Sequence, residues 1–196
     1  MKLPLFILVA LLMASCTLLK YPSVPKNIKQ NIPICYDGSI IKPEIDTPIN
    51  GFYRIKHYFT LYGANESRMI KDSSDYKFWL LTDGLFKWDE VGTNKPAWGI
   101  YEIIGDTIKT YSLCLNEYKK WDAFERWFLI NHNATLTLLH LTPINYKSIE
   151  QIKVFQGFFE QSVKEFSTAS FNKSDNLPEK AESPIMDFKW IKCKGN

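Results

Sequence analysis

The sequence has few of the features that carry catalysis or metal binding. Its three histidines (His57, His132 and His140) fall in no His-x-His or His-Glu-x-x-His spacing, and its four cysteines form no Cys-x-x-Cys pair. It has no Gly-x-Ser-x-Gly element to present a nucleophilic serine, and no glycine loop of the kind that cradles phosphate. We therefore expect no metal site, no catalytic residue, no cofactor and no enzymatic activity.

Arginine is also scarce, and the charge is nearly balanced. Three of the 24 basic residues are arginine (Arg54, Arg68 and Arg126), and the 21 acidic residues leave a formal net charge of +3. Nucleic-acid-binding proteins carry clustered basic residues with interleaved aromatics, and bidentate recognition of phosphate favours arginine. Because the sequence has neither pattern, it predicts no nucleic-acid partner.

The first sixteen residues have the pattern of an export signal. A lysine precedes an apolar run from Leu3 to Met13, and small residues follow it. This run is shorter than the ~20 residues that a membrane-spanning helix needs. Met13-Ala14-Ser15-Cys16 resembles the bacterial lipobox, in which the cysteine is lipidated and becomes the new N-terminus. The resemblance implies a signal peptide at 1–15 and a lipid anchor on Cys16; the alternative is an ordinary signal peptide with a plain thiol at Cys16.

Residues 16–50 contain five prolines, at positions 22, 25, 33, 43 and 48. Proline has no backbone N–H and fixes φ, so it breaks helices and favours extended chain. We expect this segment to be a tether between the membrane and a domain at 51–193, with Ile40, Ile41, Ile45 and Ile49 as the residues that could dock on the domain.

Three cysteines remain if Cys16 is lipidated, and they allow three pairings. We favour Cys35–Cys193, because both lie near chain ends that are otherwise weakly held. Their link closes a loop of about 158 residues, and long loops gain most in the chain-entropy model, roughly 5 kcal/mol. Cys114 would then stay reduced as a small buried apolar residue.

The domain reads as antiparallel strands, beginning with an alternating strand from Gly51 to Tyr62. Asp83-Gly84 predicts a hairpin of 76–82 with 85–89 through a two-residue turn, which would put Trp79 and Trp88 on one face. Gly105-Asp106 predicts a second hairpin, 98–104 with 107–115. A third joins 127–132 to 135–141.

The last part of the domain changes in period. Ser148 to Phe166 has a helical apolar stripe, and Ser148 with Gln151 forms a capping box at its start. A polar loop at 167–184 follows, and then a final strand through Met186, Phe188 and Trp190. The order of about eight antiparallel strands, one outer helix and a closing strand predicts a mainly β fold, a barrel or strongly curled sheet.

This order is similar to a lipocalin-type barrel. Its middle resembles small uncharacterised lipoproteins of Bacteroidota with lipocalin-like domains, which carry a Phe-x-x-x-Asp-Gly strand before a Gly-x-Tyr-x-Ile-x-Gly-Asp-x-Ile hairpin. The matching residues run from Phe78 to Gly84 and from Gly99 to Ile108. The resemblance implies a lipid-anchored protein of the outer membrane. It also implies a periplasm-facing one, because no acidic run follows Cys16.

The predicted inner faces supply the candidate ligand-binding residues. His57 is the one ionisable residue on the apolar face of its strand, and is either a hydrogen-bonded core histidine or a polar anchor in an apolar pocket. The aromatics either fill the barrel or line a cavity, since eight-stranded barrels do both. The candidate set is Tyr53, His57, Phe59, Trp79, Trp88 and Tyr101.

Two functions remain open. The first is an envelope lipoprotein that binds a small apolar or amphipathic ligand in its barrel. The second is a structural or interaction lipoprotein with a solid barrel, whose partner is another envelope protein. In both, the lipid on Cys16 provides the contact with the membrane, because two or more acyl chains suffice for stable anchoring.

The lipid anchor gives the first testable prediction. Wild-type protein should sediment with membranes and carry the added mass of the lipid. Cys16→Ser should lose both, whereas the matched variant Cys114→Ser should keep both. Identical mass and partitioning in the wild type and Cys16→Ser would contradict the prediction.

Overall fold

The computed structural model describes residues 21–39, 41, 48–49, 51–62, 69–90, 96–131, 133–144 and 168–193, with the backbone alone at 56–62 and 69–74. The predicted signal peptide, Cys16 and the predicted helix at 148–166 lie outside these residues. Within the described part of the chain, no helix has the length and apolar character that a membrane crossing needs.

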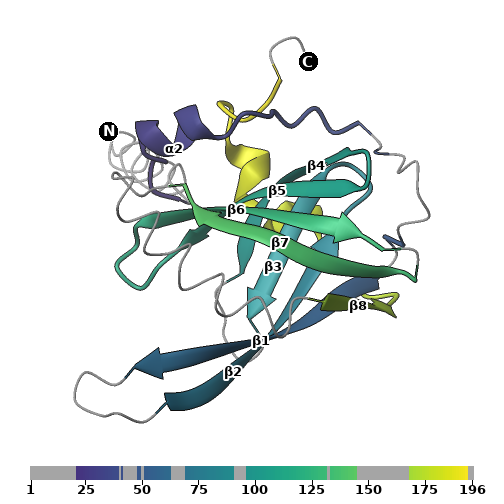
Figure 1. Cartoon of the computed structure of the whole chain (residues 1–196). Helices are drawn as coiled ribbons and strands as arrows, with labels where there is room; N and C mark the ends of the chain where they lie inside the picture. The colour runs from purple at the N-terminus through teal and green to yellow at the C-terminus, as the bar shows by residue number, and fades with distance from the viewer. Residues whose placement is uncertain are drawn as a thin grey trace, which may run out of the picture.

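The chain forms a closed antiparallel barrel in which each strand pairs with its neighbours in sequence (Figure 1). The last strand pairs with both the seventh and the first, and so closes the barrel. The mainly β barrel predicted from the sequence is confirmed. Its strands are β1 (Gly51–Tyr62), β2 (Met69–Leu80), β3 (Leu85–Glu90), β4 (Ala97–Ile104), β5 (Thr107–Leu115), β6 (Trp121–Ile130), β7 (Thr135–Pro143) and β8 (Thr168–Lys173).

Aromatic side chains fill much of the barrel interior. Phe78 is fully buried and stacks on Tyr53, Trp88 and Phe128, with ring centroids 5.2, 5.4 and 4.9 Å apart. Such stacked pairs add about 0.5–1.5 kcal/mol each beyond the area they bury. Aliphatic residues from all sides complete this interior cluster, among them Ile55, Leu80, Ile108, Ile130, Leu136 and Leu138.

The hairpin at Gly105-Asp106 has the predicted register. Tyr101 pairs with Thr110 and Ile103 with Ile108, and Gly105 takes a φ of 60° in the turn. A two-residue turn of this kind matches the twist of the strands that it joins. Gly99 on β4 is also required as glycine, because a Cβ there would lie 1.9 Å from the carbonyl oxygen of Tyr111 on β5.

The β2–β3 hairpin differs from its predicted register by one residue. The amide of Leu81 donates to the carbonyl of Leu85 (2.9 Å), so the turn has three residues and ends at Gly84 with a φ of 86°. Phe78 therefore pairs with Trp88, and Trp79 pairs with Lys87. A shift of one residue exchanges the faces of a strand. Trp79, expected inside, packs instead against a second hydrophobic cluster, which lies on the outer face of the barrel and includes Leu81, Leu85 and Trp98.

The β6–β7 hairpin shows the same departure. The amide of Asn131 donates to the carbonyl of Thr135 (3.0 Å), and Ala134 takes a φ of 56° at the end of a three-residue turn. A register shift between Trp127 and Phe128 then restores the predicted pairing of Trp127 with His140. Between the turn and this shift, Leu136 and Leu138 therefore share a face with Phe128 and Ile130, whereas the two-residue turn would have placed them on the face of Trp127 and Leu129.

The predicted extended tether is wrong for residues 21–36, which pack on the barrel. Helix α2 (Lys26–Asn31) lies between Pro25, which directly precedes it, and Pro33, which follows its end. Proline is compatible with the start of a helix, where no N–H is needed, and Pro33 lies beyond the last helical residue. Neither proline therefore interrupts the helix. Ile28 on the helix is fully buried, and Val24 and Ile32 are nearly so.

The predicted final strand and the predicted polar loop at 167–184 are also corrected. Residues 168–173 of that loop form β8, whose backbone pairs on both sides although most of its side chains are polar. The segment expected as a strand instead contains the 3-10 helix η2 (Pro184–Asp187), preceded by a shorter one, η1 (Lys180–Glu182). Ile185 and Ile191 from this segment join α2 on the outer face of the barrel.

A disulfide joins the two segments that pack on the outside of the barrel, residues 21–36 and residues 184–193. Cys35 and Cys193 are bonded, with Cα atoms 5.0 Å apart, and this is the pair selected from the sequence. The amide of Tyr36 donates to the carbonyl of Ile191, and the amide of Cys193 donates back to the carbonyl of Tyr36. Cys114 on β5 is outside the disulfide and is half-buried, not fully buried as predicted.

The corrected register of the β2–β3 hairpin gives the second prediction. Phe78→Ala should lower the free energy of unfolding by about 3–5 kcal/mol, because it leaves a cavity at the centre of the aromatic stack. Trp79→Ala should cost clearly less, since Trp79 is only partly buried. Chemical denaturation of both variants measures the difference. A larger loss of stability for Trp79→Ala than for Phe78→Ala would contradict the observed register and support the predicted two-residue turn.

Candidate functional site

A cavity of about 220 Å³ lies inside the barrel. It begins beside the aromatic stack, where Trp88 forms part of its wall. Of the seven described residues that line it, six are apolar or aromatic and one carries a charge. The lining consists of Ile55, Tyr76, Trp88, Phe124, Arg126, Leu138 and Leu141.

Arg126 is the charged residue, and the alternation of β6 places it there. Phe128 and Ile130 on β6 belong to the interior cluster, so Arg126, two residues before Phe128, lies on the same inward face. Only 6% of its surface is exposed. A charged guanidinium has therefore been moved from water into an apolar barrel, which is costly unless the charge is compensated.

The compensation within the barrel is partial. Nη1 of Arg126 donates to the hydroxyl oxygen of Ser112 on β5 (2.6 Å), and the guanidinium carbon lies 4.4 Å from the centre of the Trp88 ring and 5.1 Å from that of Phe124. Nε has no hydrogen-bond partner among the described residues. In the part of the chain that the structure describes, no carboxylate forms an ion pair with Arg126.

Arg126 nevertheless remains charged at neutral pH. Burial lowers its pKa to about 10, while Cys114 and Tyr76 act in the opposite direction. The site therefore presents a fixed positive charge to whatever occupies the cavity.

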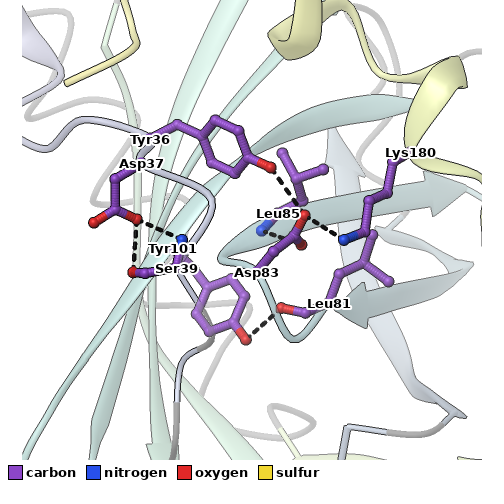
Figure 2. A network of polar contacts seen from close by, with 8 residues as sticks. All are labelled: Tyr36, Asp37, Ser39, Leu81, Asp83, Leu85, Tyr101 and Lys180. Carbon is purple, nitrogen blue, oxygen red and sulfur yellow. Dashed lines mark hydrogen bonds and ion pairs between the residues drawn. The ribbon is translucent and has the colours of Figure 1, made fainter. Parts of the chain in front are cut away.

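A larger hollow of about 360 Å³ lies beside the β2–β3 turn. Its buried carboxylate, Asp83, already has partners: the Tyr36 hydroxyl donates to it (2.9 Å) and Nζ of Lys180 lies 2.7 Å away (Figure 2). Burial and this hydrogen bond raise the pKa of Tyr36, which keeps the phenol protonated. Because Lys180 balances the charge of Asp83, we do not interpret this hollow as a binding site. Tyr36 and Lys180 instead attach the segments at 21–39 and 180–193 to the β2–β3 turn.

The sequence-based candidates are only partly brought together. Trp88 lines the cavity. Tyr53 and Tyr101 are buried in the interior cluster. The Tyr53 hydroxyl donates to the carbonyl of Pro48 (3.0 Å) and the Tyr101 hydroxyl to that of Leu81 (2.8 Å), so both side chains stabilise the barrel. Trp79 lies outside the barrel, where Nζ of Lys87 sits 5.3 Å from its ring centre. The side chains of His57 and Phe59 lie outside the described residues.

The sequence analysis missed Arg126, which is the charged residue among the described residues of the lining. The signal was present: Phe124, Arg126, Phe128 and Ile130 alternate, and a lone arginine in an apolar series marks an inward charge. The predicted strand began at Trp127, and so left out the first half of β6.

Comparisons with known proteins add no family to this picture. No family model, curated protein or solved structure matches the chain. Among the described residues, no group of three or more His, Cys, Asp or Glu side chains could hold a metal ion.

The buried charge gives the third prediction. Arg126→Met should raise the free energy of unfolding of the ligand-free protein by about 1 kcal/mol or more, because an apolar side chain of similar length removes an uncompensated charge. Arg54→Met is the matched control, since Arg54 is exposed and pairs with Asp75 outside the barrel. It should change the stability little.

Thermal and chemical denaturation measure both variants. A loss of more than about 2 kcal/mol in Arg126→Met would mean that the arginine supports the fold, and would remove the argument that it is retained for binding.

Proposed function

We propose that this protein is a lipid-anchored binding protein of the bacterial envelope, which holds a small amphipathic ligand inside its barrel. The observation that carries the proposal is the interior cavity, whose described lining is apolar except for the buried charge of Arg126. Ligand sites are typically apolar concavities with a few placed polar groups, and this cavity has that composition.

The proposed location rests on the first sixteen residues and on the resemblance of the chain to lipocalin-like lipoproteins. A lipid on Cys16 would hold the barrel at the periplasmic side of the outer membrane. The disulfide between Cys35 and Cys193 supports an exported protein, because disulfides persist in oxidising compartments.

The alternative is a solid barrel that serves as a structural or interaction module. The stacked aromatics of the interior favour filling over binding in that part of the barrel. The two functions differ in one measurable respect, which is whether a small amphiphile enters the barrel.

The fourth prediction compares two neighbouring residues of β7. Leu138 lines the cavity and is buried, whereas Leu139 is 48% exposed. The mature lipoprotein in phosphatidylcholine nanodiscs should bind at least one of octanoate, 1-octanol and octylamine saturably, at one site per chain. Leu138→Trp should weaken that binding at least tenfold by filling the cavity, and Leu139→Trp should leave it unchanged.

Isothermal titration calorimetry, with empty nanodiscs as the blank, measures the binding. If none of the three amphiphiles binds above the blank, the solid-barrel alternative stands. Equal weakening by both tryptophan variants would place the binding outside the cavity.

A further inference from the structure

We propose that the cavity recognises a carboxylate amphiphile: Arg126 pairs with the carboxylate, and the tail lies among the apolar residues of the lining. This inference rests on the proposed function and specifies its ligand class. Its first support is electrostatic. The guanidinium is buried and charged, and the described residues supply it with a hydroxyl and two aromatic faces but no carboxylate.

A ligand anion supplies the missing charge. Hydrogen bonds between ionised groups are shorter than neutral ones and roughly twice as strong, and the low-polarity surroundings increase this difference. A neutral ligand would leave the positive charge uncompensated, and a cationic one would add a second positive charge beside it. The cavity should therefore discriminate ligands chiefly by the charge of their head group.

The number and shape of the charges favour a carboxylate over a phosphate monoester. Among the described residues of the lining, Arg126 is the one that carries a positive charge, so a monoanion would neutralise the charge that these residues present. A phosphate monoester carries about −1.5 to −2 at neutral pH and would leave buried negative charge without a partner. The planar fork of the guanidinium also matches the two oxygens of a carboxylate.

Neighbouring side chains hold the guanidinium in place for this role. The hydrogen bond to Ser112 fixes one end of the fork, and the ring of Trp88 lies 4.4 Å from the guanidinium carbon. Trp88 itself is stacked on Phe78, deep in the interior cluster. Ser112 and Trp88 are thus positioning residues, which limit the freedom that Arg126 would otherwise lose on binding.

The volume of the cavity limits how much of the tail it encloses. At ~30 Å³ per water-sized group, 220 Å³ holds roughly seven non-hydrogen atoms. The rest of the lining is apolar, with Leu138, Leu141 and Ile55 available to the tail. Octanoate, with about ten non-hydrogen atoms, is a suitable probe: its carboxylate group and the next four carbons fill this volume, and its last three carbons extend beyond it.

The test compares ligands of equal tail and different head. Octanoate, 1-octanol, octyl phosphate and octylamine are titrated into the mature lipoprotein in phosphatidylcholine nanodiscs at pH 7.5, with empty nanodiscs as the blank. Octanoate should bind at least tenfold more tightly than each of the other three. Arg126→Met should bring octanoate to the level of octanol, while Arg54→Met should keep the preference.

Ser112→Ala provides a second and milder variant, which keeps the charge but removes the hydrogen bond to Nη1; it is expected to weaken the binding of octanoate severalfold with little effect on octanol. Equal affinity for octanoate and octanol in the wild type, or tighter binding of octyl phosphate or octylamine, overturns the carboxylate inference and leaves the proposed function standing. A preference for octanoate that survives Arg126→Met also overturns it. If no probe binds, the proposed function and the inference fail together.

Discussion

Closure of the barrel, with side chains alternating across its wall, is the constraint on which the rest of the structure depends. In a closed barrel every strand has one face inside, so the register of each hairpin decides which residues form the interior. The three-residue turns ending at Gly84 and Ala134 set two of these registers. They bring Phe78, Trp88 and Phe128 together as the central stack. The cavity is the space that this stack leaves unfilled on the side of Trp88.

The same alternation places one positive charge in that space. We expect an arginine at this position to lower the stability of the empty barrel, because its charge is desolvated and lacks a carboxylate among the described residues. Ser112 and Trp88 reduce that cost and fix the orientation of the guanidinium. A destabilising group that its neighbours hold in position is typical of a binding site, where local consistency is given up for function. This is the physical basis for assigning the cavity to an anionic ligand.

The sequence was sufficient for the architecture and insufficient for the interior. Gly105-Asp106 forms the predicted two-residue turn, and its hairpin has the predicted pairs. Asp83-Gly84 does not, because a glycine at positive φ suits both a two-residue turn and the end of a three-residue one. Ala134 gives even less local signal, since alanine rarely adopts positive φ. Arg126 is recognisable only once β6 is extended back beyond Trp127. Sequence pattern detects alternation well, but a one-residue slip in a turn depends on tertiary packing.

The most direct test of the account is to observe the guanidinium itself. The chain has three arginines, so the Nε–H region of a proton–nitrogen correlation spectrum holds three resonances. The one that disappears in Arg126→Met belongs to Arg126. Octanoate should shift this resonance with the same saturation curve as its calorimetric binding, and the other two should stay in place. Octanoate binding that leaves the Arg126 resonance unmoved would contradict the claim that this buried charge recognises the ligand.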